Sequence, residues 1–192
     1  MGRLVFVNSG HLNENKYTSG SGVGGVSSSN RAALKRRAAN SYCVVNTIST
    51  KTRYIKVFYP TLTIADKTIQ ISQLAVYSNE INIAPSGTTS VANTYFYGSS
   101  KDKPIDGVLS PREFPNIYHS YENSDSGYWL LDLGAEFVVE RIVYYNRTSD
   151  YGRAIGMVID TYNSTYNNSL PNAIAPLKRF TLTDGLIQTF DL

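Results

Sequence analysis

Hydrophobic and polar positions follow a strand-like pattern from residue 53 to the end of the chain. Short apolar or alternating runs are separated by clusters of Gly, Pro, Asn, Asp and Ser, which is typical of β-strands joined by turns. We expect strands at residues 53–59, 69–76, 81–84, 94–97, 128–133, 137–145, 154–159, 177–182 and 186–190. Many short strands with irregular connections favour an antiparallel sandwich.

Three details of this pattern carry further expectations. The alternation at 69–71 is out of step with that at 74–76, which predicts a β-bulge near 72–73. The run at 137–145 is apolar on both faces and therefore indicates a central strand. The Asp-Gly pair at 184–185 predicts a hairpin between the last two strands.

The N-terminal part of the chain has no such pattern after a short strand candidate at 4–7. Residues 9–30 are polar and rich in Gly and Ser, so we expect extended chain or loop. An Ala-rich stretch near 30–40 predicts one short helix, which is too short to be stable alone in water. We therefore expect an N-terminal arm at 1–52 and a β-sandwich at 53–192.

Composition supports an all-β fold and excludes several classes of protein. The chain has 15 Tyr and 14 Gly but a single cysteine, Cys43, so it can form neither an intrachain disulfide nor a thiolate metal cluster. No apolar run approaches the roughly 20 residues that span a bilayer. The apolar stretch at 4–7 is too short for the core of a signal peptide. We expect a protein that is made in a reducing compartment and not secreted.

Charge divides the chain unevenly. Residues 1–60 contain nine Lys and Arg and one Glu, a net charge of +8, whereas the whole chain carries +3. The remainder is therefore acidic, at −5. A basic arm on an acidic body predicts that the arm contacts polyanions or acidic protein surfaces.

Four motifs recur together in the second half of the chain: Ile105–Gly107, Tyr128–Gly134, Ile142–Arg147 and Arg153–Gly156. In order and spacing they resemble the discoidin or coagulation-factor type C domain, one of the galactose-binding-like jelly rolls. The resemblance implies a jelly-roll sandwich over 53–192. In the second motif, Trp129 and Leu131 would face one side of a strand. Asp132 would accept hydrogen bonds from nearby backbone or from an arginine.

A second resemblance covers nearly the whole chain. Residues 16–24 and 31–38 look like the N-terminal arms of structural proteins from large icosahedral DNA viruses of algae and protists, the phycodnavirus-like group. The segments 71–77, 118–120 and 186–190 extend the similarity. Such proteins are minor capsid components that lie beneath or between capsomers. The resemblance implies a virion protein, made in the host cytoplasm, whose partners are the major capsid protein and other minor capsid proteins.

The arm carries a cationic cluster of four residues: Arg31, Lys35, Arg36 and Arg37. We expect it to dock on acidic faces of neighbouring proteins. Contact with the genome through phosphates, contact with an anionic inner membrane, and a solvated helix face are the alternatives. The expected function is a structural minor capsid or cement protein that links subunits through its arm and sandwich loops.

A carbohydrate-binding module is the alternative function. By similarity to galactose-binding-like lectins, His119, Arg147, Tyr151 and Arg153 would form a glycan site in the sandwich loops, with Tyr stacking and Arg and His hydrogen bonding. The same residues could instead brace the loops, with Arg147 bonding backbone carbonyls.

We expect no enzyme, since the chain has two histidines and no catalytic motif. No cofactor is expected either. Some members of the discoidin family hold calcium in their loops, and that resemblance would assign the oxygens of Asp102, Asp106 and Glu113 to such an ion.

Overall fold

The computed structural model describes residues 50–60, 68–92, 95–121, 127–167 and 174–192. The chain divides into two units, 1–48 and 49–192, and every described residue belongs to the second. The strand expected at 4–7, the helix expected near 30–40 and the four cationic arm residues lie outside the described residues.

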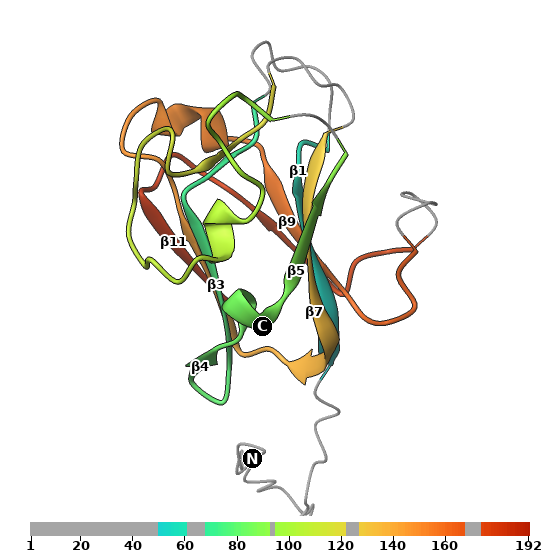
Figure 1. Cartoon of the computed structure of the whole chain (residues 1–192). Helices are drawn as coiled ribbons and strands as arrows, with labels where there is room; N and C mark the ends of the chain where they lie inside the picture. The colour runs from blue at the N-terminus through green and yellow to red at the C-terminus, as the bar shows by residue number, and fades with distance from the viewer. Residues whose placement is uncertain (1–49, 61–67, 93–94, 122–126, 168–173) are drawn as a thin grey trace, which may run out of the picture. The chain divides into compact units, whose positions relative to one another are not determined.

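Two larger antiparallel sheets form the two layers of the second unit (Figure 1). The first contains, in order across the sheet, β10 (Lys178–Thr181), β9 (Val158–Tyr162), β1 (Lys51–Phe58), β7 (Tyr128–Val138) and β5 (Thr88–Val91). The second contains β11 (Ile187–Asp191), β8 (Arg141–Tyr145), β3 (Gln73–Ser78) and β4 (Ile81–Asn82). All their strand pairs are antiparallel, so the expected all-β class is confirmed.

Smaller elements complete the described part of the chain. A two-stranded sheet pairs β2 (Gln70–Ile71) with β6 (Tyr118–His119). The helical elements in the described residues are three short 3₁₀ helices: η1 (Ala84–Ser86), η2 (Lys103–Ile105) and η3 (Tyr151–Ala154).

The hydrophobic core lies between the two larger sheets. Alternate residues of β1 and β7, including Ile55 and Trp129, join alternate residues of β3 and β8, including Val76 and Tyr144, in one buried cluster. This alternation is why strands with one apolar face form the two layers. The indole N–H of Trp129 donates to the backbone oxygen of Lys101 at 2.8 Å, so even the largest core side chain has its polar atom satisfied.

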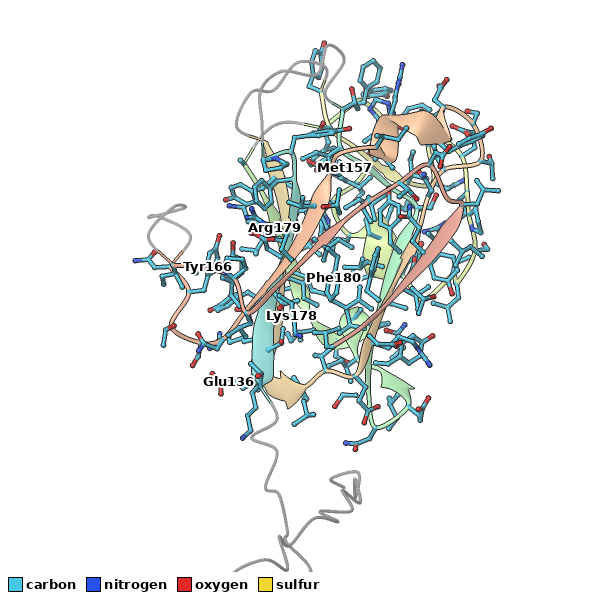
Figure 2. All side chains as sticks on the ribbon, turned by 180° about the vertical axis from the view of Figure 1, so that it is seen from behind. Glu136, Met157, Tyr166, Lys178, Arg179 and Phe180 are labelled. Carbon is cyan, nitrogen blue, oxygen red and sulfur yellow. The ribbon has the colours of Figure 1, made fainter. Side chains whose placement is uncertain are left out.

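The outer face of the five-stranded sheet holds a buried ion pair. Asp160 on β9 is fully buried, and its carboxylate accepts two hydrogen bonds of 2.7 Å from the guanidinium of Arg179 on β10. The hydroxyl of Tyr162 donates to the same carboxylate at 2.9 Å. Figure 2 shows Arg179 on this side of the molecule. The buried charge is thus held by a two-point contact with one arginine.

The expected boundary between strands at residues 128–133 and 137–145 is wrong. β7 continues through Gly134 to Val138, and β8 starts at Arg141. Gly134 has a φ of 80°, which allows residues 133–136 to bulge opposite Arg53 before pairing resumes.

Asp132 stabilises this bulge. Its carboxylate accepts bonds of 2.8 and 3.0 Å from Arg53 and one of 2.8 Å from the Gly134 N–H. Those are the two kinds of donor expected from the sequence, an arginine and nearby backbone.

The expected hairpin at 184–185 is also wrong. β10 pairs with β9 and β11 pairs with β8, so the chain crosses from one sheet to the other at this point. The side-chain amide of Gln188 explains how the crossing is stabilised. It accepts from the Thr183 N–H at 2.8 Å and donates to the carbonyls of Thr183 and Gly185 at 3.0 and 3.1 Å. The Gln188 side chain thus bonds the backbone groups that would pair with the opposite strand if this segment formed a hairpin.

Other segments differ in detail. The irregularity expected near 72–73 is present. It lies at Ser72, which separates β2, paired with β6, from β3, paired with β8. The strand expected at 154–159 starts only at Val158, after η3. The strand expected at 94–97 shows, in its described part, a single bridge between Tyr95 and Ser120. β5 was not expected because its sequence is mostly polar; it pairs along β7.

Candidate functional site

A pocket of about 220 Å³ lies among the loops and the short strand β6. Its lining residues are Phe96, Phe114, His119 and Arg147. Two of the four residues expected in a glycan site therefore line one pocket, although 28 positions separate them in the sequence. The two phenylalanines were not expected there.

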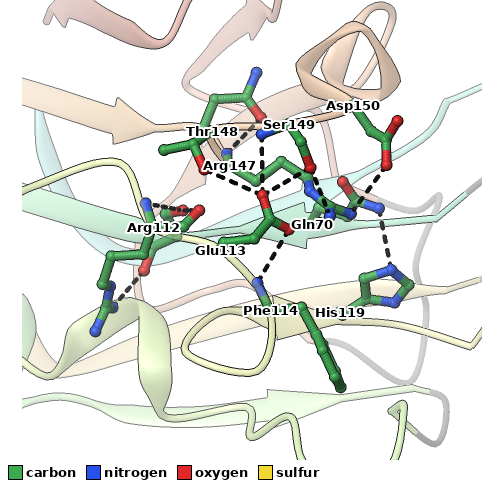
Figure 3. Close-up of polar contacts among 11 residues, drawn as sticks. Gln70, Arg112, Glu113, Phe114, His119, Arg147, Thr148, Ser149 and Asp150 are labelled. Carbon is green, nitrogen blue, oxygen red and sulfur yellow. Dashed lines mark hydrogen bonds and ion pairs between the residues drawn. The ribbon is translucent and has the colours of Figure 1, made fainter.

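His119 forms part of the pocket wall and is 7% exposed. Its Nδ1 lies 2.9 Å from the backbone oxygen of Ser120, and its Nε2 lies 3.1 Å from the side-chain nitrogen of Gln70 (Figure 3). A carbonyl oxygen only accepts, so Nδ1 carries the proton and Nε2 accepts from the Gln70 amide. The imidazole is thus held in one orientation by a contact at each ring nitrogen.

Arg147 reaches the pocket from the loop after β8, and its side chain is 9% exposed. Its guanidinium donates to the Glu113 carboxylate and to the hydroxyl of Ser149, the latter at 3.0 Å. A second nitrogen lies 3.6 Å from the carboxylate of Asp150. The Arg147 Nε is buried and has no partner among the described residues. Two nearby acids therefore neutralise the cation that faces the pocket.

Glu113 is the centre of this network (Figure 3). Besides Arg147, its carboxylate accepts from the Phe114 N–H at 3.1 Å, the Thr148 hydroxyl at 3.1 Å, and the Ser149 N–H and hydroxyl at 3.0 and 2.8 Å. Burial raises the pKa of Glu113. The hydrogen bonds from Ser149, Phe114 and Arg147 lower it by a larger amount, so the net result is a pKa of about 2. The network joins the loop before Phe114 to the loop after β8.

Arg147 therefore braces two loops in the described structure. The bracing alternative raised from the sequence assigned it backbone carbonyls as partners, whereas the structure assigns it the carboxylate of Glu113. Glu113 lies 34 positions from Arg147, and the sequence offers no local signal that joins the two.

Exposed aromatic side chains lie on two pocket-lining residues, Phe96 and Phe114, and on the chain segments next to Phe96 and His119; we call this group the aromatic rim. We define it as Tyr95, Phe96, Tyr97, Phe114 and Tyr121, whose exposed fractions run from 37% for Phe96 to 97% for Tyr97. Phe96 stacks on Tyr121 with ring centroids 5.4 Å apart and meets Phe114 edge-on at 6.1 Å. The signal that could have found Phe96 and Phe114 is their position as aromatics in turn-rich loops, the signal that marks Tyr95, Tyr97 and Tyr121 in the sequence.

Tyr151 and Arg153 are not among the residues that line the pocket. Both belong to η3. The backbone oxygen of Tyr151 accepts from the Asn146 side chain at 2.9 Å, and that of Arg153 accepts from the Tyr59 hydroxyl. Tyr151 is 46% exposed, so its ring lies open to solvent. The structure thus splits the four expected glycan residues into two pairs.

The three acids considered as calcium ligands each contact a different cationic side chain. The pairs are Asp102 with Lys101, Asp106 with Arg112, and Glu113 with Arg147. Among the described residues, no group of three or more His, Cys, Asp or Glu side chains gathers as a metal site would require. The structure therefore does not bring these three acids together.

No known protein family, curated protein or solved structure matches this chain. Within the described ranges, no helix has the length and apolar character needed to cross a membrane.

Proposed function

We propose that this protein is a structural, non-catalytic assembly component: a minor capsid or cement protein of a large DNA virus, with a galactose-binding-like jelly-roll body. The observation that carries the proposal is the aromatic rim. Exposed aromatic side chains that gather at one place favour contact with another protein, because burying them releases water from large apolar surfaces.

The rim suits docking for a second reason. Tyr and Phe have few rotatable bonds, so ordering them at an interface costs little conformational entropy. The Glu113–Arg147 network fixes the loop that carries Phe114, so this part of the rim is already positioned before contact. The pocket that Phe96 and Phe114 of the rim help to line offers a recess of about 220 Å³ for a side chain of the partner.

The charge distribution supports the same function. The sequence places +8 in residues 1–60 and −5 in the rest. In a shell of repeated subunits, a basic arm would attract acidic surfaces of neighbours, and the cationic cluster Arg31, Lys35, Arg36 and Arg37 is the part of the arm best suited to that contact.

Incorporation into virus particles tests the proposal. We expect Tyr97→Ser, which removes the most exposed rim side chain, to reduce the amount of protein recovered in purified particles several-fold. Tyr151→Ser is the matched control, since Tyr151 is 46% exposed but lies outside the rim. Equal incorporation of both variants would contradict docking through the rim. Cross-linking within the particle would then identify the neighbours.

Carbohydrate binding is a second candidate because one pocket combines His119 and Arg147 with two phenylalanine rings. The apolar face of a sugar ring can pack on Phe96 or Phe114, while its hydroxyls bond the polar side chains. We expect Phe96→Leu to weaken binding of a sugar found on a glycan array, with Tyr151→Leu as control. An array without signal at millimolar sugar would eliminate this candidate.

A further inference from the structure

On its outer side, the edge strand β11 presents backbone groups that have no partner among the described residues. It lies at the end of the four-stranded sheet, and among the described strands it pairs only with β8 (Figure 1). The backbone oxygen of Leu186 accepts from the Asn146 N–H, and the Leu192 N–H donates to the oxygen of Glu140. Even-numbered residues of this segment therefore direct their amides toward β8.

Amides of successive strand residues point to opposite edges, so the odd-numbered residues of β11 direct theirs away from the sheet. These are Ile187, Thr189 and Asp191, all of which are exposed. Each offers one N–H and one C=O on the open side. A strand edge of this kind is a template for pairing with another strand.

Most of the features that usually block such pairing are missing from β11, whose one charged residue, Asp191, lies at its end. It contains no Lys, Arg or Pro, and the exposed fraction of Ile187 is 55%. The five-stranded sheet ends at β10, which begins with Lys178 and Arg179 (Figure 2), and at β5, which is four residues long. Long cationic side chains on an edge strand oppose association. β4 is only two residues long.

We propose that β11 pairs antiparallel with β11 of a second copy of this chain, so that the two four-stranded sheets become one continuous sheet. The two-fold axis would pass beside Thr189. Thr189 then faces Thr189 of the second copy, and Ile187 faces Asp191 of the second copy. In this register every outward N–H meets an outward C=O.

Side-chain pairing in this register favours a second copy over an unrelated strand. Thr–Thr pairs across antiparallel strands are favourable, and no like charges face each other directly. The same surface on both copies is self-complementary, as a two-fold interface requires. This pairing leaves the aromatic rim untouched, so it is independent of the proposed function.

The mass of the purified full-length protein in solution tests the inference. We expect light scattering after gel filtration to give the mass of a dimer. Thr189→Lys places two ammonium groups opposite each other at the axis and should weaken self-association about tenfold or more. Thr181→Lys is the matched control, because Thr181 is an exposed threonine on β10, one of the two edge strands of the other sheet. The dimer should persist in this variant.

Two further measurements keep the outcome decisive. Thr189→Pro removes an outward N–H without removing a bond to β8, and it should also give monomers. Fluorescence of Trp129, the single tryptophan, shows whether each variant is folded. A monomeric wild-type protein at its highest soluble concentration would overturn the proposal. So would a dimer that survives in folded Thr189→Lys.

Discussion

Replacing Glu113 with glutamine tests whether the network around the pocket stabilises the fold. The substitution keeps the shape of the side chain but removes its charge. The carboxylate accepts hydrogen bonds from Arg147, Phe114, Thr148 and Ser149, and a neutral amide cannot accept all of them. Arg147, with a side chain 9% exposed, would also lose its closest counter-charge.

The expected loss follows from the pKa of Glu113. A fall from the usual 4.5 to about 2 would correspond in full to roughly 3 kcal/mol of folding free energy. The Glu113 side chain is 38% exposed, so solvent screens part of this interaction. We therefore expect Glu113→Gln to lower the free energy of unfolding at pH 7 by about 1–2 kcal/mol.

The pH dependence has a defined direction. The pKa of Glu113 is lower in the folded state, so its contribution to stability is complete above pH 4.5 and is lost as the pH falls toward about 2. The difference in stability between wild type and Glu113→Gln should therefore shrink over that interval. Urea unfolding followed by the fluorescence of buried Trp129 measures the difference at each pH.

Glu80→Gln is the matched control. The Glu80 side chain is 80% exposed and lies 3.5 Å from Arg141, so its removal should change stability by less than about 0.5 kcal/mol. If Glu113→Gln is no more destabilising than this control at pH 7, the network does not brace the fold. A stability difference that stays constant between pH 7 and pH 2 would refute the assignment to the charge of Glu113.

Two further predictions, one about packing at Gly87 and one about the Asp160–Arg179 ion pair, can be tested by the same urea assay. Gly87→Ala should destabilise the protein by about 1–3 kcal/mol, because its Cβ would lie 2.8 Å from the backbone oxygen of Asp132. Gly152→Ala should be close to neutral, since no atom lies within 4 Å of its Cβ; equal effects would contradict this account. Arg179→Ala should cost about 1–3 kcal/mol, because it removes the two hydrogen bonds that Arg179, itself 47% exposed, donates to the buried carboxylate of Asp160. A loss below about 1 kcal/mol would show that water replaces the arginine.

The sequence predicted the strands with clear alternation better than it predicted their ends. Strands near 53–59, 128–133 and 186–190 are present because one face of each is apolar. The boundary at Gly134 failed because a glycine with positive φ permits either a turn or a bulge within a strand, and only the partner strand selects between them. β5 has little apolar pattern, so only its pairing with β7 identifies it.

The candidate site was partly accessible from the sequence. His119 and Arg147 were selected by a resemblance, and the structure places both at one pocket. Glu113 was considered only as a calcium ligand, because nothing local to it indicates its contact with Arg147. Phe96 and Phe114 were missed because the loops alone determine which aromatic residues meet.

By itself, the sequence determined the all-β class, the approximate positions of most strands and the division of charge between a basic arm and an acidic body. These properties depend on local alternation and on composition. The tertiary structure decided which strands are neighbours, where Asp184 and Gly185 carry the chain between sheets, and which charged groups meet around the pocket. Those outcomes depend on the energies of contacts between residues far apart in the chain. The pattern of neighbouring residues in the sequence does not reveal those contacts.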